Sequence, residues 1–328
     1  MNTTSSTSQE GPAVVVVYSV ALFVVIVLAL LGNSVVFVAF YRSSALHNAS
    51  VAFILSLAVT DILVASISIP IWLSFQLNQC FYLSNVLCNK TTYTVWKCVD
   101  VLFSTASIMN LCAISIDKFI VITKPLHYPN IMTSKRANIA LAAIWIFAVS
   151  LAALVTVHWD FFPTFVFIVS FIFPSFIMIY SYSRIFKTAL SQARRVFPIR
   201  QTYYFKRELK AAKTLAIVMG TFIACWAPFF LVNLIVSYRP DLFPSAVTTA
   251  GIKLLHYINS ALNPLIYSLS NKEFRYKILR VLPCKLGRRN NTHMIDRVVF
   301  WSTTFSQSAD LGNTSFPRQK SLRVNRKE

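Results

Sequence analysis

The sequence predicts an all-α protein: a bundle of seven transmembrane helices followed by a short amphipathic eighth helix. Of its 328 residues, 56% are hydrophobic and only 13% are charged, whereas soluble domains are about 25% charged. Apolar stretches long enough to cross the ~30 Å hydrocarbon core of a bilayer occur at residues 13–41, 50–77, 93–123, 137–158, 161–186, 209–237 and 247–270. Seven crossings put the two ends of the chain on opposite sides of the membrane.

The basic residues set the orientation of these crossings. Lys90, Lys97, Arg239 and Lys253 fall on one side, and the rest of the 31 Lys and Arg fall on the other. The positive-inside rule then makes the N-terminus extracellular and the C-terminal tail cytoplasmic. This orientation, together with contact with anionic inner-leaflet lipid, explains most of the net charge of +20, so no nucleic-acid partner is expected.

The two ends of the chain differ from the bundle at 13–270. Residues 1–12 are rich in Ser and Thr and carry a glycosylation sequon at Asn2, which predicts a glycosylated outer tail. In residues 271–284, charged residues alternate with bulky apolar residues at helical spacing, and the segment ends at Cys284. This pattern predicts a helix on the membrane surface with a palmitoylation site. A free thiol is the alternative for this cysteine. Residues 285–328 are polar and basic, as expected for a disordered tail with phosphorylation sites.

The outer loops are short. The loop at 78–92 holds Cys80, Cys88 and a second outward sequon at Asn89. Of the six cysteines, only Cys80 and Cys88 look like an extracellular disulfide pair. The loop between the fourth and fifth spans is hardly more than residues 158–163, so it cannot build a long outer lid.

Buried polar residues mark the first two spans. Asn33 follows Gly32 in an apolar helix, which we interpret as a helix-packing hydrogen bond, and Pro70 is expected to kink the second span. Asp61 lies near mid-membrane with no basic residue at its depth, so it must be protonated or neutralised by a cation. The oxygen-bearing side chains at its depth suit sodium: Ser107, Asn259, Ser260 and Asn263. A hydrogen-bonded network around a protonated Asp61 is the alternative.

The third span carries an acid near each end. Asp100 and Asp117 lie roughly 25 Å apart along a helix that rises 1.5 Å per residue, so one acid is near each membrane face. The level of Asp100 also holds the aromatic residues Trp226, Phe229, Phe230 and Tyr257. An acid in an aromatic cup is what an organic ammonium ion needs. Pairing with Lys97 or with Lys253 is the alternative.

These residues, taken together, carry a family resemblance. Motif residues occur in all seven spans: Gly32 with Asn33, Asp61, Asp100, Asp117 with Lys118 and Phe119, Trp145, Pro174 with Tyr182, residues 225–228 and residues 263–267. Over residues 13–284 the sequence resembles the rhodopsin-like (class A) G-protein-coupled receptors, nearest to the biogenic-amine branch. A channel or transporter is disfavoured because the polar stripe of the third span ends at an aromatic floor around Trp226 and no inverted repeat is apparent.

The resemblance implies a plasma-membrane receptor, not an enzyme, that has no cofactor and takes sodium as an allosteric ligand. It implies a small extracellular ligand, heterotrimeric G proteins and membrane lipid as partners, with arrestin and a receptor kinase as candidates at the tail. The candidate ligand contacts, from the resemblance and from the residues themselves, are Asp100, Ser104, Ser170, Trp226, Phe229, Phe230, Lys253 and Tyr257. The implied activation switch comprises Ile108, Pro174, Phe222, Trp226, Tyr182 and Tyr267, and the inner lock comprises Asp117, Lys118 and Glu208.

The sequence departs from the family pattern at positions that bear on its ligand and its signalling. Lys118 stands where the family usually has arginine. Lysine keeps the positive charge but lacks the planar, forked guanidinium group of arginine. Tyr93 replaces the expected cysteine, so the usual outer bridge cannot form. Lys253 and His256 put a cation and an imidazole where amine receptors generally have neither, and Ser170 alone on the fifth span could meet a ligand hydroxyl. An orphan, peptide or zwitterion receptor on the same fold is therefore the alternative.

Lys253 leaves two outcomes open. It lies four residues before Tyr257, one helical turn further out. Lys253 could pair with Asp100 in the empty receptor, so that a simple amine has to break this contact. Otherwise the two charges could serve a zwitterion.

Overall fold

The computed structural model describes residues 12–41, 49–77, 89–157, 159–195 and 199–270, all of which belong to one compact unit, Met1–Leu282. The predictions for Asn2, Cys80, Cys88, Cys284, the helix at 271–284 and the tail lie outside these residues. The side chains of Glu208 and Tyr267 also lie outside the described part, although their backbone is helical.

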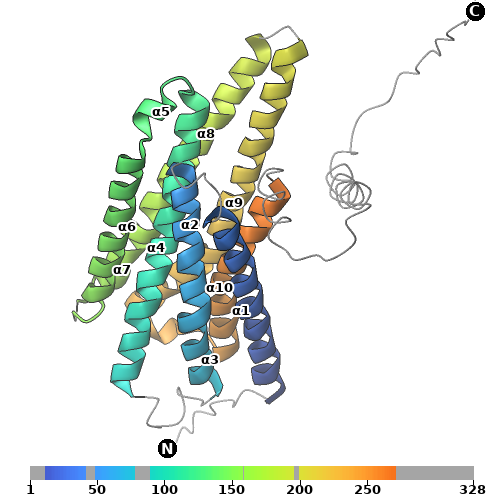
Figure 1. Ribbon diagram of the computed structural model, residues 1–328. Coiled ribbons are helices and arrows are strands. Elements are labelled where there is room, and N and C mark those ends of the chain that lie inside the picture. Colours follow the sequence, from blue (N-terminus) through green and yellow to red (C-terminus); the bar gives the residue numbers. More distant parts are fainter. Residues whose placement is uncertain (1–11, 42–48, 78–88, 158, 196–198, 271–328) are drawn as a thin grey trace, which may run out of the picture. The chain divides into compact units, whose positions relative to one another are not determined.

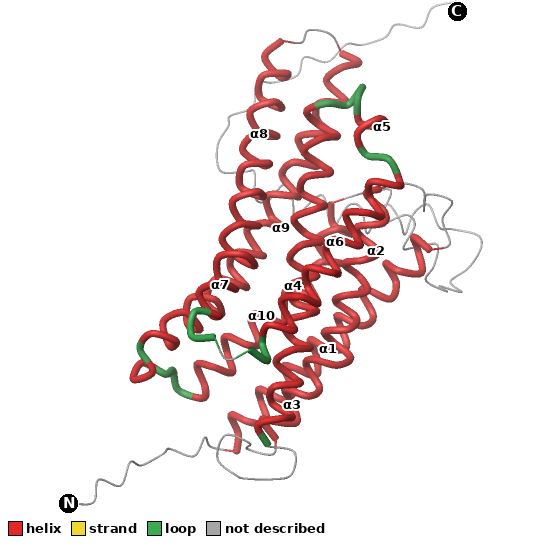
Figure 2. Tube along the Cα trace, turned by 90° about the vertical axis from the view of Figure 1, so that its left-hand side faces the viewer, coloured by secondary structure: helices red, strands yellow, loops and turns green. Residues whose placement is uncertain are grey.

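The described residues form helices joined by short connections, with no strand among them (Figure 2). The elements are α1 (Pro12–Tyr41), α2 (Ala49–Leu63), η2 (Val64–Ser68), α3 (Ile69–Leu77), α4 (Lys90–Thr123), α5 (Tyr128–Ile131), α6 (Ser134–Leu154), α7 (Phe162–Phe167), η4 (Ile168–Ile172), α8 (Phe173–Arg195), α9 (Ile199–Tyr238), η5 (Pro240–Leu242) and α10 (Ala246–Ser270). Within the described ranges, six helical stretches are long and apolar enough to span a membrane. The more polar α10 covers the seventh predicted span, so the predicted fold class is confirmed.

The sequence also predicts a short inner loop at 194–210, and this prediction is wrong, because residues 194–195 and 199–210 are helical. Helix α8 continues to Arg195, and α9 begins at Ile199. Residues 199–210 contain neither Gly nor Pro, and proline is common where a helix begins. Both helices therefore extend well beyond the predicted membrane spans (Figure 1).

Two prolines each follow a π-helical turn. In η2 the N–H of Ile69 bonds to the carbonyl of Val64, and in η4 the N–H of Phe173 bonds to the carbonyl of Ile168. Pro70 and Pro174 come directly after these donors. A proline has no N–H for the carbonyl four residues earlier, and a π-turn is one way for a helix to absorb that loss. The predicted distortion at Pro70 is therefore a π-turn just before the proline.

Helix α4 is the hub of the bundle. It packs against α2, α6 and α8, while α1 packs on α2 and α10, and α9 lies between α8 and α10 (Figure 1). Apolar side chains also cover outward faces, with Val17 69%, Ile146 67% and Phe176 67% exposed. Such faces suit contact with lipid, while polar side chains such as Asn33, Asp61 and Asp100 are buried inside the described bundle.

Helices α1 and α10 approach closely at Gly32. A Cβ atom at this position would lie 2.9 Å from Cγ of Pro264. At the next residue, Asn33 Nδ2 donates to the carbonyl of Ser260 at 3.0 Å and to that of Ala29 at 2.9 Å. Asn33 is 2% exposed. The structure thus gives Asn33 the helix-packing role that the sequence predicted.

We expect Gly32→Ala to lower the thermal stability of the purified protein. Alanine favours a helix interior by about 1 kcal/mol over glycine, but here its methyl group would collide with the rigid ring of Pro264. Gly220→Ala is the matched control, because nothing lies within 4 Å of a Cβ there. Melting curves in detergent should show a loss for the first variant and no loss for the second. A melting temperature for Gly32→Ala at or above the wild-type value would contradict the close contact.

Candidate functional site

A buried ion pair lies in the part of the bundle that the sequence assigns to the extracellular half. Lys253 Nζ donates to Asp100 Oδ2 at 2.7 Å, and the Tyr257 hydroxyl donates to Asp100 Oδ1 at 3.1 Å. Each side chain of the pair is 7% exposed. The carboxylate from α4 is thus held by two donors that lie one turn apart on α10.

Four aromatic rings surround the ammonium group of Lys253. Its Nζ lies 4.5 Å from the ring centroid of Phe229, 4.8 Å from Trp96, 5.2 Å from Tyr257 and 5.6 Å from Trp72. Each distance is within the ~6 Å at which a cation is attracted to the face of a ring. We call these four residues, with Asp100, the ammonium cage.

The cage differs from the aromatic cup that the sequence predicted. Phe229 and Tyr257 belong to both, but Trp72 and Trp96 were missed. Trp96 could have been found, because it precedes Asp100 by four residues on the same helix face. Trp72 could not, because its direction depends on the π-turn η2 that precedes it.

The outer ends of α3 and α4 are joined by aromatic packing at the position where the family's usual cysteine is missing. Trp72 stacks on Trp96 at 4.9 Å between ring centroids, and Phe75 meets Trp96 edge-on at 5.7 Å. Tyr93, which replaces the cysteine, lies 5.4 Å from Trp96. The Nε1 atom of Trp96 donates to the carbonyl of Ser68 at 3.2 Å. These contacts tie α4 to α3 and η2 near the cage.

Polar groups lie deeper, between the cage and the centre of the bundle. The His256 ring lies 4.1 Å from that of Trp226, and its Nε2 is 3.2 Å from Ser104 Oγ. Phe230 stacks on Trp226 at 5.6 Å. His256 Nδ1, Trp226 Nε1 and Ser170 Oγ are buried and have no hydrogen-bond partner in the described part of the chain. Buried polar atoms are nearly always satisfied by protein, water or ligand, so these atoms are candidate ligand or water contacts.

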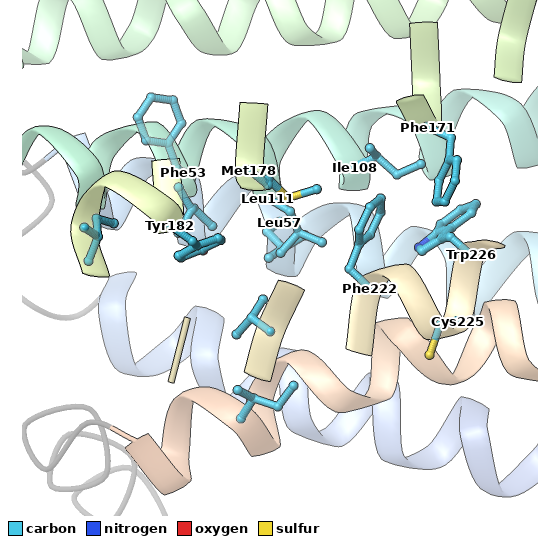
Figure 3. Packing of buried hydrophobic residues seen from close by; sticks show 14 of the residues in the cluster. Phe53, Leu57, Ile108, Leu111, Phe171, Met178, Tyr182, Phe222, Cys225 and Trp226 are labelled. Atoms are coloured by element: carbon cyan, nitrogen blue, oxygen red, sulfur yellow. The ribbon is translucent and has the colours of Figure 1, made fainter. Parts of the chain in front are cut away.

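Four of the predicted switch residues, Ile108, Tyr182, Phe222 and Trp226, belong to one apolar cluster (Figure 3). The Phe222 ring lies 6.3 Å from Trp226 and 6.1 Å from Phe171, and Ile108 is 1% exposed in the same cluster. Pro174, two residues after the end of η4, is also buried. The cluster connects the level of Trp226 with residues further along α8 and α9, so a shift of Trp226 would disturb its packing.

Asp61 is fully buried and hydrogen-bonded on both oxygens. Ser107 Oγ donates to Oδ1 at 3.3 Å, and Asn263 Nδ2 donates to Oδ2 at 2.8 Å. Asn259 and Ser260 are buried as well, at 3% and 5% exposure. Over the described ranges, no lysine or arginine forms a salt bridge with Asp61. One carboxylate with hydroxyl and amide groups is an oxygen-rich set, which fits a hard monovalent cation.

A second set of contacts lies at the predicted cytoplasmic end of α4. Asp117 accepts hydrogen bonds from Tyr128 at 2.8 Å, from Lys118 at 3.0 Å and from Ser50. Lys118 Nζ also donates to Ser50 Oγ at 3.0 Å. Burial raises the pKa of the Tyr128 phenol to about 12, and the hydrogen bond to the charged Asp117 shifts this pKa in the same direction. The hydroxyl therefore remains a donor at physiological pH. Lys118 is thus turned toward α2, and the sequence missed both Ser50 and Tyr128 as its neighbours.

Tyr182 reaches the same helix from α8. Its hydroxyl lies 3.1 Å from Ser115 Oγ, and the Ser115 hydroxyl also donates to the carbonyl of Leu111. The contact ties α8 to α4 two residues before Asp117. The two other residues predicted for this end, Glu208 and Tyr267, have side chains outside the described part.

Comparison with known proteins decides the family. The family described as "7 transmembrane receptor (rhodopsin family)" matches residues 32–162 and 155–267. The chain belongs to this family. It is therefore a multi-pass membrane receptor of the G-protein-coupled type, as the sequence motifs predicted, and not an enzyme.

Several receptors are similar to this one over most of its length. The human histamine H2 receptor is 34% identical over 313 residues, which cover 88% of this chain and 86% of that receptor. The octopamine receptor beta-2R of Chilo suppressalis is 32% identical over 80% of this chain and 78% of that receptor. The rat alpha-1A adrenergic receptor is 31% identical over 82% of this chain and 69% of that receptor.

We expect Tyr128→Phe to raise the basal output of the receptor. The change removes one of the donors to the buried carboxylate of Asp117 and leaves those of Lys118 and Ser50, and a hydrogen bond to a charged group stabilises by roughly 1.5–3 kcal/mol. Tyr180→Phe, at an exposed tyrosine of α8, is the control. Agonist-free cAMP and calcium signals at matched surface expression measure the effect. Basal signals that are equal in the two variants would show that this contact does not hold the resting state.

Proposed function

We propose that this receptor binds a small extracellular ligand with a protonated amine at Asp100 and activates heterotrimeric G proteins. One observation carries the proposal: the Asp100 carboxylate and the surrounding rings already hold an ammonium group, that of Lys253. The chemistry of the site is thus that of an ammonium site. The names of the similar receptors support the same ligand class, since they refer to histamine, octopamine and adrenergic ligands.

The contacts also offer a route from the ligand to the cytoplasmic face. His256 lies between Tyr257 of the cage, at 4.8 Å, and Trp226, at 4.1 Å. Trp226 in turn packs on Phe222, whose cluster includes Tyr182. A ligand that moves these rings would favour a second arrangement of α8 and α9 and so shift the population toward the form that binds G protein. As the family resemblance implies, Tyr182 and Tyr267 would then turn inward while α9 moves outward.

A response panel with an Asp100 variant tests the ligand class. Cells that express the receptor are exposed to primary amines and amino acids, with cAMP and calcium as readouts. We expect Asp100→Asn to reduce the potency of every agonist at least tenfold, because it removes a charge-assisted contact of roughly 1.5–3 kcal/mol. Asp160→Asn, at an exposed loop aspartate, is the control at matched surface expression. An agonist that keeps its potency on Asp100→Asn would contradict binding at this carboxylate.

We further propose that Asp61 binds sodium together with Ser107, Asn259, Ser260 and Asn263. The support is the fit of these oxygen-bearing groups and the lack of a basic partner within the described chain. A bound sodium ion would supply the positive charge that Asp61 otherwise lacks. Because Asn263 and Ser260 belong to α10, such an ion would favour one position of this helix relative to α2 and α4.

Sodium dependence of thermal stability tests this site without any ligand. Replacing potassium by sodium at constant ionic strength should raise the melting temperature of the wild-type receptor, since an ion that binds only the folded state stabilises it. Asp61→Asn should lose this difference, while Asp100→Asn, the control in the other buried site, should keep it. The same sodium-dependent shift in Asp61→Asn as in wild type would remove the proposal.

Asn89 remains a proposed glycosylation site. It is exposed and caps α4, with Oδ1 accepting from the Thr92 N–H at 2.7 Å and from the Thr92 hydroxyl at 2.9 Å. A glycan attached to Nδ2 would leave this oxygen available as a cap.

A further inference from the structure

Lys253 takes up the contacts that an external ammonium ligand would need. Its Nζ is bound by Asp100 at 2.7 Å and faces the four rings of the cage, and the residue is 6% exposed. The lysine is tethered to α10 and so has a high effective concentration at the site. An incoming amine therefore meets a carboxylate that is already neutralised.

The charges of the site disfavour a plain monoamine. Asp100 and Lys253 sum to zero, so a monoamine that enters beside them adds an uncompensated positive charge to a buried region, which is unfavourable. Moving Lys253 away would first require breaking its bond to Asp100 and its contacts with the rings. Lys253 is also seven residues, or about 10 Å along the helix, from Ala246, where α10 begins, and it is only 6% exposed.

A zwitterion avoids both penalties. An ammonium contributes three N–H donors, and Asp100 Oδ2 is the hydrogen-bond acceptor that the structure gives Lys253 among the described residues. A carboxylate has about four acceptor positions, and Asp100 uses one for Lys253 and one for Tyr257. Both charges can therefore accept a further partner of opposite sign. A ligand with an ammonium and a carboxylate leaves the sum of charges at zero.

The surrounding polar groups can hold the rest of such a ligand. His256 Nδ1 and Trp226 Nε1 are buried without a partner in the described ranges, and both rings pack against Phe229 of the cage. No second carboxylate contacts Lys253 in the same ranges. The site thus offers two opposite charges and neutral polar groups, which also disfavours a diamine.

Building on the proposed amine site, we propose that Lys253 is a tethered occupant of the ammonium cage, and that the natural ligand is a zwitterion. Its ammonium binds Asp100 and its carboxylate binds Lys253. Amino acids and their close analogues are the ligand class that this arrangement selects. The resting receptor is held by its own lysine, and the ligand adds to the ion pair at the positions that Asp100 and Lys253 leave open, without breaking their bond.

Matched ligand pairs test the ligand class. The common amino acids are compared with the amines that their decarboxylation gives, on wild type, Lys253→Met, Asp100→Asn and the control Lys97→Met, whose ammonium lies over Phe162 outside the cage. We expect wild type to prefer an amino acid over its amine. Lys253→Met should lower the potency of that amino acid at least tenfold and raise the potency of the amine, and Lys97→Met should change neither preference.

The outcomes separate this inference from the proposed function. A wild-type receptor that responds to none of the amino acids, or that prefers every amine to its amino acid, overturns the zwitterion assignment. If Lys253→Met leaves the potency of each amino acid and of each amine at its wild-type value, the assignment is overturned as well. Responses that survive Asp100→Asn instead overturn the proposed amine site, whatever Lys253→Met shows.

A ligand-free measurement tests the tethered pair itself. Melting temperatures are compared for wild type, Asp100→Asn, Lys253→Met and the double variant. If the two side chains neutralise each other, each single change leaves a buried charge alone, so the double variant should lose less than the two single losses together. Additive losses, or no loss in either single variant, would overturn the occupancy of the cage by Lys253.

Discussion

A charge inside the hydrocarbon layer has to be compensated where it stands, and this requirement organises the interior of the receptor. The buried aspartates of the described chain meet it in different ways. Asp100 has a lysine from another helix, Asp117 has a neighbouring lysine with two hydroxyl groups, and Asp61 has only neutral donors. Two of these acids lie near the ends of α4, which is therefore held to its neighbours by polar contacts as well as by apolar packing.

Helix α10 couples the outer half of the bundle to its centre. The same helix supplies Lys253 and Tyr257 to Asp100, and Asn263 to Asp61. It is also bound to α1, through the hydrogen bond from Asn33 to the carbonyl of Ser260. A displacement of α10 at the cage would therefore be felt at Asp61, which gives the two sites a common mechanical element. This arrangement satisfies the physical requirement for linkage between a ligand and an ion, namely that both bias one movable part.

The sequence was sufficient for features that depend on composition and on spacing along one helix. The spans followed from hydropathy, and the approach of Tyr257 to Asp100 followed from the family resemblance. The pairing of Asp100 with Lys253 could not be decided from the sequence. A lysine near a helix end can either snorkel outward or turn inward, and neighbouring helices decide between the two. Ser50 was missed because its approach to Asp117 joins segments 67 residues apart in the chain. Tyr128 is only 11 residues from Asp117, and it was missed because the turn that brings it back to the end of α4 is not predicted by helical spacing. The inner ends of α8 and α9 were misjudged because apolar length indicates only the part of a helix that crosses the membrane, and both helices continue beyond it.

The π-turns before Pro70 and Pro174 have a consequence for comparing this receptor with others. A π-turn places one additional residue in a helical turn, and one residue corresponds to about 100° of rotation. Positions counted outward from Asp61 along a regular helix are therefore displaced onto another face beyond Ser68, and Trp72 is among them. Alignment with a receptor whose second span is a regular α-helix needs a one-residue gap within 64–68. Without that gap, Trp72 would be aligned with a residue that points elsewhere. The alignment would then omit one of the four rings of the cage, although the structure contains it.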